Sequence, residues 1–174
     1  MAKEQEMFFF IADISGYTAY MLDNATAVEH AKLSITLLIE TLVKKIQIPL
    51  EISKLEGDAI FLYLQKRIDD PLTLTKKIFS FFDLFDRKVN ELKISDICPC
   101  GACQNIDKLN LKIIAHYGKA SFQQIGPFKE LAGIDVILIH RLLKNQVPLK
   151  RYFLLTEAAY QKMLIPENVK ISKM

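Results

Sequence analysis

Two aspartates stand where carboxylates can act on a metal ion. Asp13 ends a run of apolar residues, and Asp58 follows Gly57 between two short extended segments. The apolar run predicts a buried strand, and a glycine turn between two such segments predicts a hairpin. If the strand neighbours the hairpin, both carboxylates reach one point at the strand end. Paired carboxylates there suit Mg²⁺ or Mn²⁺, hard ions that prefer oxygen ligands and phosphate partners.

The residues after Asp13 offer a place for a phosphate group. Ser15, Gly16 and Tyr17 break the strand and begin a helix, and backbone N–H groups at a helix start can hold a phosphate. Spacing alone leaves a purely structural interpretation open, in which Asp13 caps that helix and Asp58 fills a turn.

All the cysteines of the chain lie close together, at positions 98, 100 and 103. Thiolates at the C-x-C-x-x-C spacing of Cys98, Cys100 and Cys103 can converge on one Zn²⁺ in a Gly/Pro turn. A fourth ligand would come from His116, Asp96 or a residue of a partner chain. Two other interpretations stay open: a redox or disulfide-forming loop, and reduced surface thiols.

The remaining histidines carry less information. His30 lies in a polar helix start, so we expect it to be solvated. His140 is next to Arg141, where a surface role is favoured over contact with a ligand.

Hydrophobic periodicity and turn signals predict the elements that position these residues. The expected strands cover residues 7–12, 50–55, 59–64, 109–116 and 152–155, with 120–125 pairing back onto 109–116 after Gly118. The expected helices cover 17–22, a stretch capped by Asn24 or Thr26 and ending near 46, 69–92, 133–144, and a stretch capped by Thr156 and ending near 164. Because this order contains a βαββαβ core, we predict an α+β, ferredoxin-like fold.

Composition narrows the class of protein. The 174 residues suit a single domain, 1–174, with a cysteine-containing insert at about 95–108, and 51% hydrophobic residues suffice for a packed core. The net charge of +3 is too small, and the lysines too scattered, to predict nucleic-acid binding. No apolar stretch reaches the roughly 18 residues of a membrane span, and an odd number of cysteines argues against a secreted disulfide framework. We therefore expect a cytoplasmic protein without membrane contact.

Five segments resemble, in order, motifs of the catalytic domain of class III adenylate/guanylate cyclases. The family's apolar-Ala-Asp-Ile-x-Gly-Phe-Thr motif resembles FFFIADISGYT, and its Lys-x-x-Gly-Asp-Ala motif resembles KLEGDAIF. The strand ending Ile-His-x-Gly resembles LKIIAHYG, the Gly-x-x-Val-Asn-x-Ala-x-Arg motif resembles GIDVILIHR, and the last core strand resembles YFLLT. More closely, the chain resembles a bacterial family of uncharacterised proteins (domain of unknown function 2652, DUF2652), whose members share this layout and the cysteine insert.

The resemblance implies roles for particular residues. Asp13 and Asp58 match the two metal-binding aspartates, which in the family hold two Mg²⁺ or Mn²⁺ ions for phosphoryl chemistry. Lys54 and Glu130 fall at the purine-reading positions, and Arg141 matches the arginine that stabilises charge on the α-phosphate. Because family sites form between two chains, the resemblance also implies a homodimer that binds ATP or another purine nucleotide.

The chain also departs from the family pattern. Ile137 stands where the family keeps a ribose-orienting Asn, and losing one oriented donor costs about 10²–10³ in rate. The family's later basic contact to the triphosphate has no clear counterpart, since Lys170 and Lys173 are poor candidates. We therefore predict a degenerate cyclase-like protein that binds a purine nucleotide and a divalent metal in a regulatory role. An active adenylate cyclase forming cyclic AMP from ATP, and a zinc-stabilised protein-interaction module, stay open as alternatives.

Overall fold

A computed structural model describes residues 3–47, 49–65, 70–95 and 98–173. Asp69 and Asp96, which the sequence analysis considered as a helix start and a zinc ligand, lie outside these ranges. The elements are, in chain order, β1 (Gln5–Ser15), α1 (Tyr17–Asp23), η1 (Ala25–Ala27), α2 (Val28–Lys45), β2 (Glu51–Glu56), β3 (Ala59–Leu64), α3 (Pro71–Ser95), α4 (Gly101–Gln104), η2 (Ile106–Lys108), β4 (Asn110–Ile125), β5 (Phe128–Ala132), α5 (Ile134–Leu142), β6 (Tyr152–Leu155) and α6 (Glu157–Tyr160).

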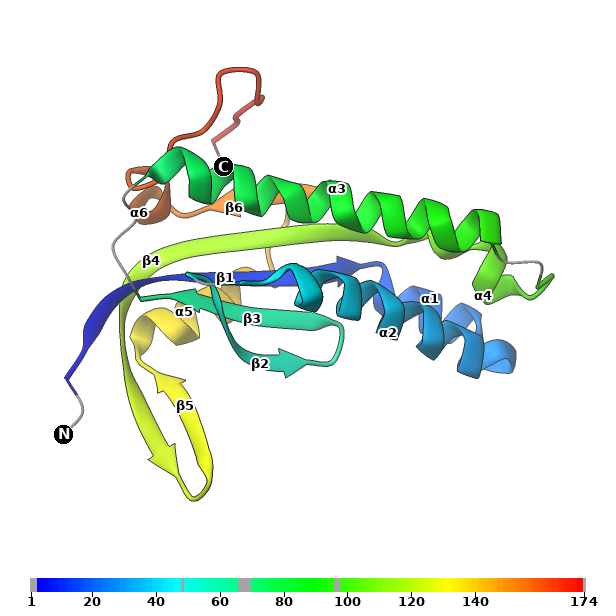
Figure 1. Ribbon diagram of the computed structural model, residues 1–174, viewed down its shortest axis with the longest axis horizontal. Helices are drawn as coiled ribbons and strands as arrows, with labels where there is room; N and C mark the ends of the chain where they lie inside the picture. The colour runs from blue at the N-terminus through cyan, green and yellow to red at the C-terminus, as the bar shows by residue number, and fades with distance from the viewer. Residues whose placement is uncertain (1–2, 48, 66–69, 96–97, 174) are drawn as a thin grey trace.

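β1 occupies the centre of the sheet. The strand order is β2-β3-β1-β4-β5, all antiparallel neighbours, and β6 pairs with β4 in parallel. Figure 1 shows α2 and α3 on one side of this sheet and α5 on the other. Because side chains alternate along a strand, Phe8 and Phe10 join the core under α2 and α3, whereas Phe9 and Ile11 join a second core beside α5. The mixed architecture confirms the predicted α+β fold.

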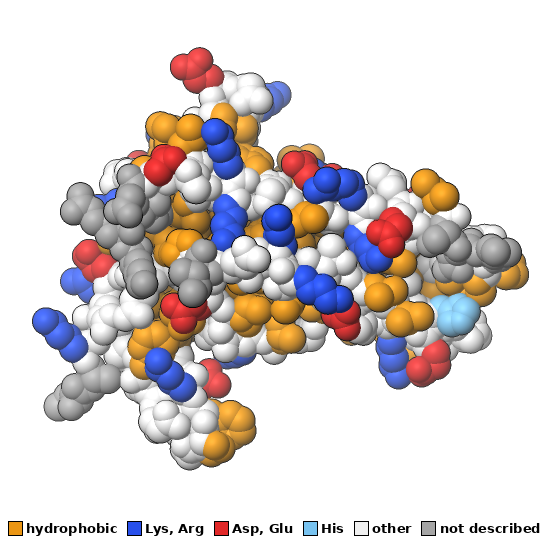
Figure 2. Space-filling view, in the orientation of Figure 1, with side chains coloured by type: hydrophobic (Ala, Val, Ile, Leu, Met, Phe, Trp, Pro, Cys, Tyr) orange, Lys and Arg blue, Asp and Glu red, His pale blue; other side chains and the backbone are white. Residues whose placement is uncertain are grey.

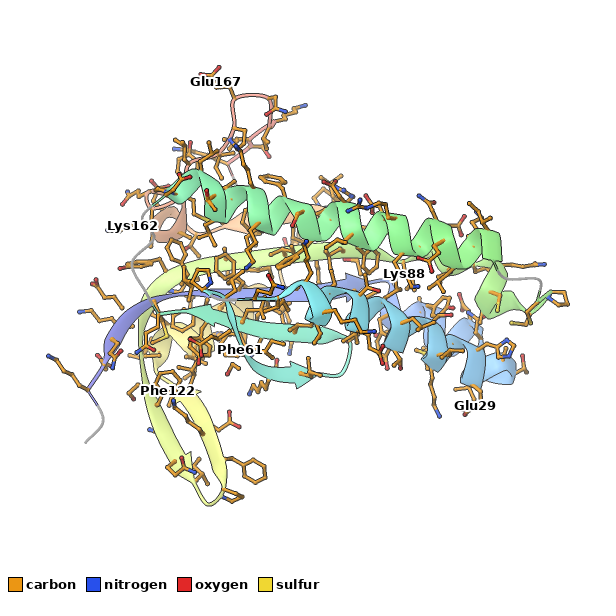
Figure 3. The ribbon with its side chains drawn as sticks, viewed as in Figure 1. Glu29, Phe61, Lys88, Phe122, Lys162 and Glu167 are labelled. Atoms are coloured by element: carbon orange, nitrogen blue, oxygen red, sulfur yellow. The ribbon has the colours of Figure 1, made fainter. Side chains whose placement is uncertain are left out.

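The helices bury one stripe each against the sheet. On α2 the buried residues Ala31, Ile35, Leu38 and Leu42 recur at three- and four-residue intervals, as expected for an amphipathic helix. The opposite side of the sheet carries Phe61 and Phe122, which Figure 3 labels and which belong to the core that includes Leu142 of α5. Within the described ranges, none of the helices combines the length and apolar character that crossing a bilayer requires.

Side chains cap the starts of α3 and α6, and of these two caps Thr156 was predicted. Asp70 accepts a hydrogen bond from the Leu72 backbone N–H at 3.0 Å at the start of α3, and Thr156 Oγ1 accepts one from the Ala159 N–H at the start of α6. The cap of α2 was wrong, because a 3₁₀ turn precedes this helix and its N-cap is Ala27. α6 ends at Tyr160, earlier than the expected residue 164, because further turns replace the helix.

The prediction that the chain turns at Gly118 was also wrong. β4 is one 16-residue strand that passes through Gly118, and the turn lies at Gly126 instead. The partner of the far half of β4 is β5, which the sequence analysis did not anticipate. Gly118 has a different purpose: a Cβ atom there would overlap the carboxylate of Asp135 at the start of α5. The glycine marks a close approach between a strand and a helix.

This contact yields a stability prediction for Gly118→Ala. The new methyl group displaces the Asp135 carboxylate, whose Oδ2 accepts the Lys119 backbone N–H at 2.6 Å and whose Oδ1 pairs with His116 Nε2 at 3.1 Å. Because hydrogen bonds to a charged group are worth about 1.5–3 kcal/mol, we expect a loss of that size in the free energy of urea unfolding. The same substitution in an Asp135→Ala background should cost clearly less; equal costs in both backgrounds contradict the explanation.

Candidate functional site

The structure brings Asp13 and Asp58 together. Asp13 lies near the C-terminal end of β1, paired with Ala59 of β3 on one side and Lys112 of β4 on the other. Asp58 occupies the β2–β3 turn, and its carbonyl accepts the Ile14 backbone N–H at 3.3 Å. The hairpin was predicted at this position, and its neighbour in the sheet is β1, as the sequence analysis assumed.

The charge of Asp13 acts on the carboxyl group of Asp58. Burial and the nearby negative charge of Asp13 raise the pKa of Asp58 to about 6, from an ordinary value of 3.8. The ammonium group of Lys112 lies 3.2 Å from Asp13 Oδ1, and both side chains are less than one-fifth exposed. Sequence reasoning missed Lys112, because its position opposite Asp13 depends on the pairing of β1 with β4. The lysine neutralises part of the charge that a divalent ion would otherwise balance.

The predicted phosphate turn follows directly. Ser15 ends β1 opposite Asn110, Gly16 adopts a left-handed conformation with φ of 90°, and Tyr17 begins α1. A side chain at position 16 would be strained by this φ and would also crowd the Lys108 carbonyl at 3.2 Å. The turn therefore holds its shape next to Asp13, although α1 is only seven residues long.

A second group of predicted residues meets between β2, β5 and α5. Lys54 and Arg141 line a hollow of about 780 Å³, which Val136, Ile137, His140 and Lys144 also line. Glu130 joins them, since its Oε2 lies 3.9 Å from Lys54 Nζ. The structure thus places both predicted purine-reading residues beside the predicted phosphate-binding arginine. Ile137, 61% exposed, lies where the cyclase resemblance expects the ribose-orienting Asn.

Lys54 has carboxylate partners in this hollow. Its Nζ lies 2.9 Å from Glu56 Oε1, and this hydrogen bond, opposed by burial and helped by the charges of Glu56 and Glu130, raises the pKa of Lys54. Glu56 also faces His140 Nε2 at 3.1 Å, while His140 Nδ1–H donates to the Val136 carbonyl at 2.7 Å. His140 is therefore held beside Glu56 rather than free on the surface. The hollow thus contains a preformed ion pair between Lys54 and Glu56.

His116 does not reach the cysteines, so its proposed role as a fourth zinc ligand was wrong. Its Nδ1 lies 2.9 Å from Thr156 Oγ1, and its Nε2 lies 3.1 Å from Asp135 Oδ1. Burial opposes ionisation of Asp135, but the Lys119 N–H and His116 hold its pKa below the ordinary value. The histidine of the H-x-G motif thus links β4, the start of α6 and α5.

The residue beside the three cysteines is His30. Its Nδ1 lies 3.3 Å from Cys98 Sγ, 3.4 Å from Cys100 Sγ and 3.5 Å from Cys103 Sγ. We expected His30 to be solvated, and its side chain is exposed at the surface; its position beside the three cysteines was not predicted. The partners are up to 73 residues apart in the sequence, so only the packing of α2 against the cysteine segment reveals them.

The cysteines are poised as thiols and not as a disulfide. The Cys100 and Cys103 sulfurs are 3.4 Å apart, far beyond the bond length of about 2.05 Å. A hydrogen bond from the Cys103 backbone is the largest cause that lowers the pKa of Cys100 to about 6, although burial opposes this shift. Hydrogen bonds with the side chains of Cys103, Cys98 and His30 contribute to the same lowering. A thiolate is therefore available near neutral pH.

Comparison with known proteins gives one family and one fold. A sequence model of the family described as "Protein of unknown function (DUF2652)" matches residues 35–152, more than half of the chain. The uncharacterised protein Rv2561/Rv2562 of Mycobacterium tuberculosis is 34% identical over 112 residues, which are 64% of this chain and 52% of that protein. The chain therefore spans about half the length of the curated relative it matches.

Several solved structures share the fold. A bacterial light-regulated adenylyl cyclase matches with a TM-score of 0.69 and 16% identity over 95% of this chain and 47% of that one. The guanylyl cyclase Cya2 matches with a TM-score of 0.65 and 11% sequence identity, over 98% of this chain and 89% of that one. A class III adenylyl cyclase-like ATP-binding protein from Pseudomonas aeruginosa matches with a TM-score of 0.67 and 15% sequence identity, over 94% of this chain and 36% of that one. At these identities the matches establish the class III cyclase-like fold, in agreement with the expected resemblance.

The raised pKa of Asp58 leads to a prediction about how stability depends on pH. Because the pKa of Asp58 is higher in the folded chain than its ordinary 3.8, the ionised carboxyl lowers stability above pH 6 and has no such effect below about pH 4. Without added Mg²⁺ or Mn²⁺, Asp58→Asn should raise Tm near pH 7.5 by about 2–4 °C, or about 1 kcal/mol after allowance for solvent screening.

The gain should shrink steadily as the pH falls from 7.5 toward 4, as followed by differential scanning fluorimetry. Asp23→Asn, which changes an exposed carboxylate at the other end of α1, serves as the matched control and should show no such trend. A gain from Asp58→Asn that is independent of pH is incompatible with a raised pKa of Asp58 in the folded chain.

Proposed function

The chain belongs to the family of proteins of unknown function DUF2652, and we propose that it binds a purine nucleoside triphosphate together with a divalent metal ion, in a regulatory role and without efficient turnover. One observation carries the proposal: Asp13 and Asp58 meet at the end of a buried strand, where burial and the nearby charge of Asp13 raise the pKa of Asp58 to about 6. Like charges held together in this way favour a cation that neutralises both.

The donor set suits a hard ion. Asp13 and Asp58 offer carboxylate oxygens, which Mg²⁺ and Mn²⁺ prefer over the softer ligands that zinc takes. When bound, such an ion would supply positive charge to the triphosphate. Two such ions together would also lower the pKa of an attacking hydroxyl. Lys112 competes with it for Asp13, so the ammonium group must move aside when the ion binds, and affinity is reduced accordingly.

The hollow beside α5 has the chemistry to receive a nucleotide. Arg141 and Lys144 offer positive charge to phosphate oxygens. Lys54 can donate to a ring nitrogen of the purine, and Glu130 can accept from an exocyclic amino group, a combination that favours adenine. Both side chains already lie within ion-pair distance of each other, so little rearrangement is needed to present them to one base edge.

The same hollow explains why turnover is expected to be poor. Ile137 has no hydrogen-bonding group, so nothing at this position can orient a ribose hydroxyl for attack. Loss of one oriented donor costs about 10²–10³ in rate. A structural neighbour with this fold is described as a class III adenylyl cyclase-like ATP-binding protein, which is in keeping with ATP binding by this fold.

We further propose that the site forms between two copies of the chain. Asp13 lies on the side of the sheet that α5 also covers, because its strand neighbours on that face, Phe9 and Ile11, join the core beside α5. On the same side, α5 exposes Ile134 (84%) and Ile137 (61%). Figure 2 shows a further apolar group at the tip of the β4–β5 hairpin, where Ile125 and Phe128 are exposed. Exposed apolar groups of this kind favour an interface, here a homodimer in which each copy completes the site of the other.

The proposal predicts ligand-dependent stability without product. ATP with Mn²⁺ should raise Tm, since a ligand at 100 times its Kd stabilises the folded state by about 2.7 kcal/mol. Asp13→Ala should abolish this shift, because it removes one of the two ion-binding carboxylates. Pyrophosphate release should stay at the level of a protein-free control in both cases.

Asp23→Ala provides the matched control, since it deletes an exposed carboxylate from α1 and should keep the full shift. Pyrophosphate release that depends on Asp13 identifies an active cyclase instead of a regulatory binder. Absence of any shift with ATP or GTP, in Mg²⁺ or in Mn²⁺, contradicts nucleotide binding altogether.

A further inference from the structure

We propose that His30, Cys98, Cys100 and Cys103 bind one structural Zn²⁺, and that this centre holds α1 in place beside Asp13. The nucleotide site does not use these four residues. Their ligand atoms all lie within 4.8 Å of one another, in a group that contains three sulfurs and one imidazole nitrogen. The first half of the proposal, the zinc centre, is independent of the proposed function; the second half, its effect on the nucleotide site, rests on it.

The spacing of the ligand atoms fits a tetrahedral ion. Zinc takes sulfur at about 2.3 Å and imidazole nitrogen at about 2.0–2.1 Å, so tetrahedral geometry separates nitrogen from sulfur by about 3.5 Å. The observed distances from His30 Nδ1 to the three sulfurs are 3.3, 3.4 and 3.5 Å. The Cys100–Cys103 sulfur distance of 3.4 Å is slightly shorter than the roughly 3.8 Å of a tetrahedral thiolate pair, so these two sulfurs need move apart only a little.

The ligand types select the metal and its role. Three thiolates and one imidazole suit zinc and are poor ligands for Mg²⁺ or Mn²⁺, so this centre and the carboxylate pair do not compete for one ion. Four protein ligands fill a tetrahedral shell, which leaves no position for water or substrate. The centre is therefore structural and not catalytic.

The ion would join two distant parts of the chain. His30 lies in the first turns of α2, and Figure 3 labels its neighbour Glu29 at the end of the molecule where α4 also lies. Cys98 and Cys100 precede α4 and Cys103 lies within it, next to the fully buried Ala102, and Ile106 of η2 is buried beyond it. This segment consists of one short helix and one 3₁₀ turn, so a metal bond to α2 would constrain it in addition to its few buried side chains.

The cysteine segment in turn contacts α1. Tyr20 of α1 is buried, and its hydroxyl donates to the Ala102 carbonyl at 2.8 Å. Asn24, also buried, donates from its Nδ2 to the Tyr20 carbonyl at 2.7 Å. A Cβ atom at Gly101 would lie 2.8 Å from Asn24 Oδ1, so only glycine permits this close approach. α1 is therefore fixed by the residues between the second and third cysteines.

A second contact reaches the turn after Asp13 itself. A Cβ atom at Gly16 would lie 3.2 Å from the Lys108 carbonyl, at the end of η2. Figure 1 shows α1 and α4 at the same end of the molecule, with η2 leading into β4. Displacement of the cysteine segment thus removes support from both ends of the 16–24 stretch. Loss of zinc should loosen α1 and weaken binding at the carboxylate pair.

Metal content tests the first half of the proposal. Elemental analysis of the purified wild-type chain should find about one zinc per chain, and His30→Ala should lose most of it. Lys32→Ala, on the same exposed stretch of α2, is the matched control and should keep its zinc. Absence of zinc in the wild type, with the cysteines recovered as disulfides by thiol titration, overturns the proposal. Equal zinc in wild type and His30→Ala also overturns it.

A measurement on the wild type alone covers the case in which His30→Ala fails to fold. Co²⁺ added to the chelator-treated chain should give the visible absorption of tetrahedral cobalt with thiolate ligands, and Zn²⁺ should displace it. A spectrum of octahedral cobalt, or no spectrum in the refolded chain, contradicts a closed Cys₃His site.

Amide hydrogen exchange tests the link to α1 without any nucleotide. Zinc removal should accelerate exchange in residues 17–24 by at least about tenfold while the centre of β1 stays protected. Tyr20→Phe should keep the zinc but accelerate exchange in the same stretch, because it removes the hydrogen bond to Ala102. Unchanged exchange after zinc removal overturns the link.

The ATP and Mn²⁺ thermal shift completes the test. It should shrink on zinc removal and in Tyr20→Phe if both proposals hold. Zinc binding and α1 protection without any nucleotide shift would leave the zinc link intact and contradict only the proposed function. A full nucleotide shift in the zinc-free chain would support nucleotide binding and contradict the link.

Discussion

The register of β1 between β3 and β4 is the constraint on which the rest of the molecule depends. The strand is buried on both faces, so its side chains alternate between the core under α2 and α3 and the core beside α5. A shift of one residue would move each set of side chains to the opposite face of the sheet, against the helix that now covers the other set. The same register sets Asp13 between Ala59 and Lys112 and beside the turn that holds Asp58. Position of the carboxylate pair is thus a consequence of core packing.

The carboxylate pair and the cysteine centre place opposite demands on the fold. Burial and the charge of Asp13 disfavour the ionised carboxylate of Asp58, and Lys112 offsets only part of this effect, so the pair lowers stability near neutral pH; the proposed cation would restore it. Natural sites often keep such locally unfavourable groups because the groups have a function. The proposed zinc centre, in contrast, would cross-link α2 to the residues that support α1. The carboxylate pair lowers stability unless the proposed cation is bound, whereas the proposed zinc centre would stabilise the elements around that pair.

Local sequence patterns predicted the parts of the fold that local forces decide. The apolar run before Asp13 and the Gly57 turn were sufficient to predict β1, the β2–β3 hairpin and the meeting of two carboxylates. Gly118 was misjudged because a glycine in a strand looks the same in sequence whether the chain turns there or approaches another element, here Asp135. His30 and Lys112 could not be identified, because each acquires its partners only when elements far apart in the sequence pack together. The order of the elements was enough to predict the fold class, whereas the full set of residues at each site can be identified only from tertiary contacts.

The central claim is that Asp13 and Asp58 bind a divalent cation. Electron paramagnetic resonance of free Mn²⁺ tests it most directly, because bound ions lose the sharp signal of the free ion. Titration in the presence of a non-hydrolysable ATP analogue should show saturable Mn²⁺ binding to the zinc-loaded wild type, and the Asp13→Asn/Asp58→Asn double variant should show none above the analogue alone. Equal Mn²⁺ binding by wild type and double variant would contradict the account.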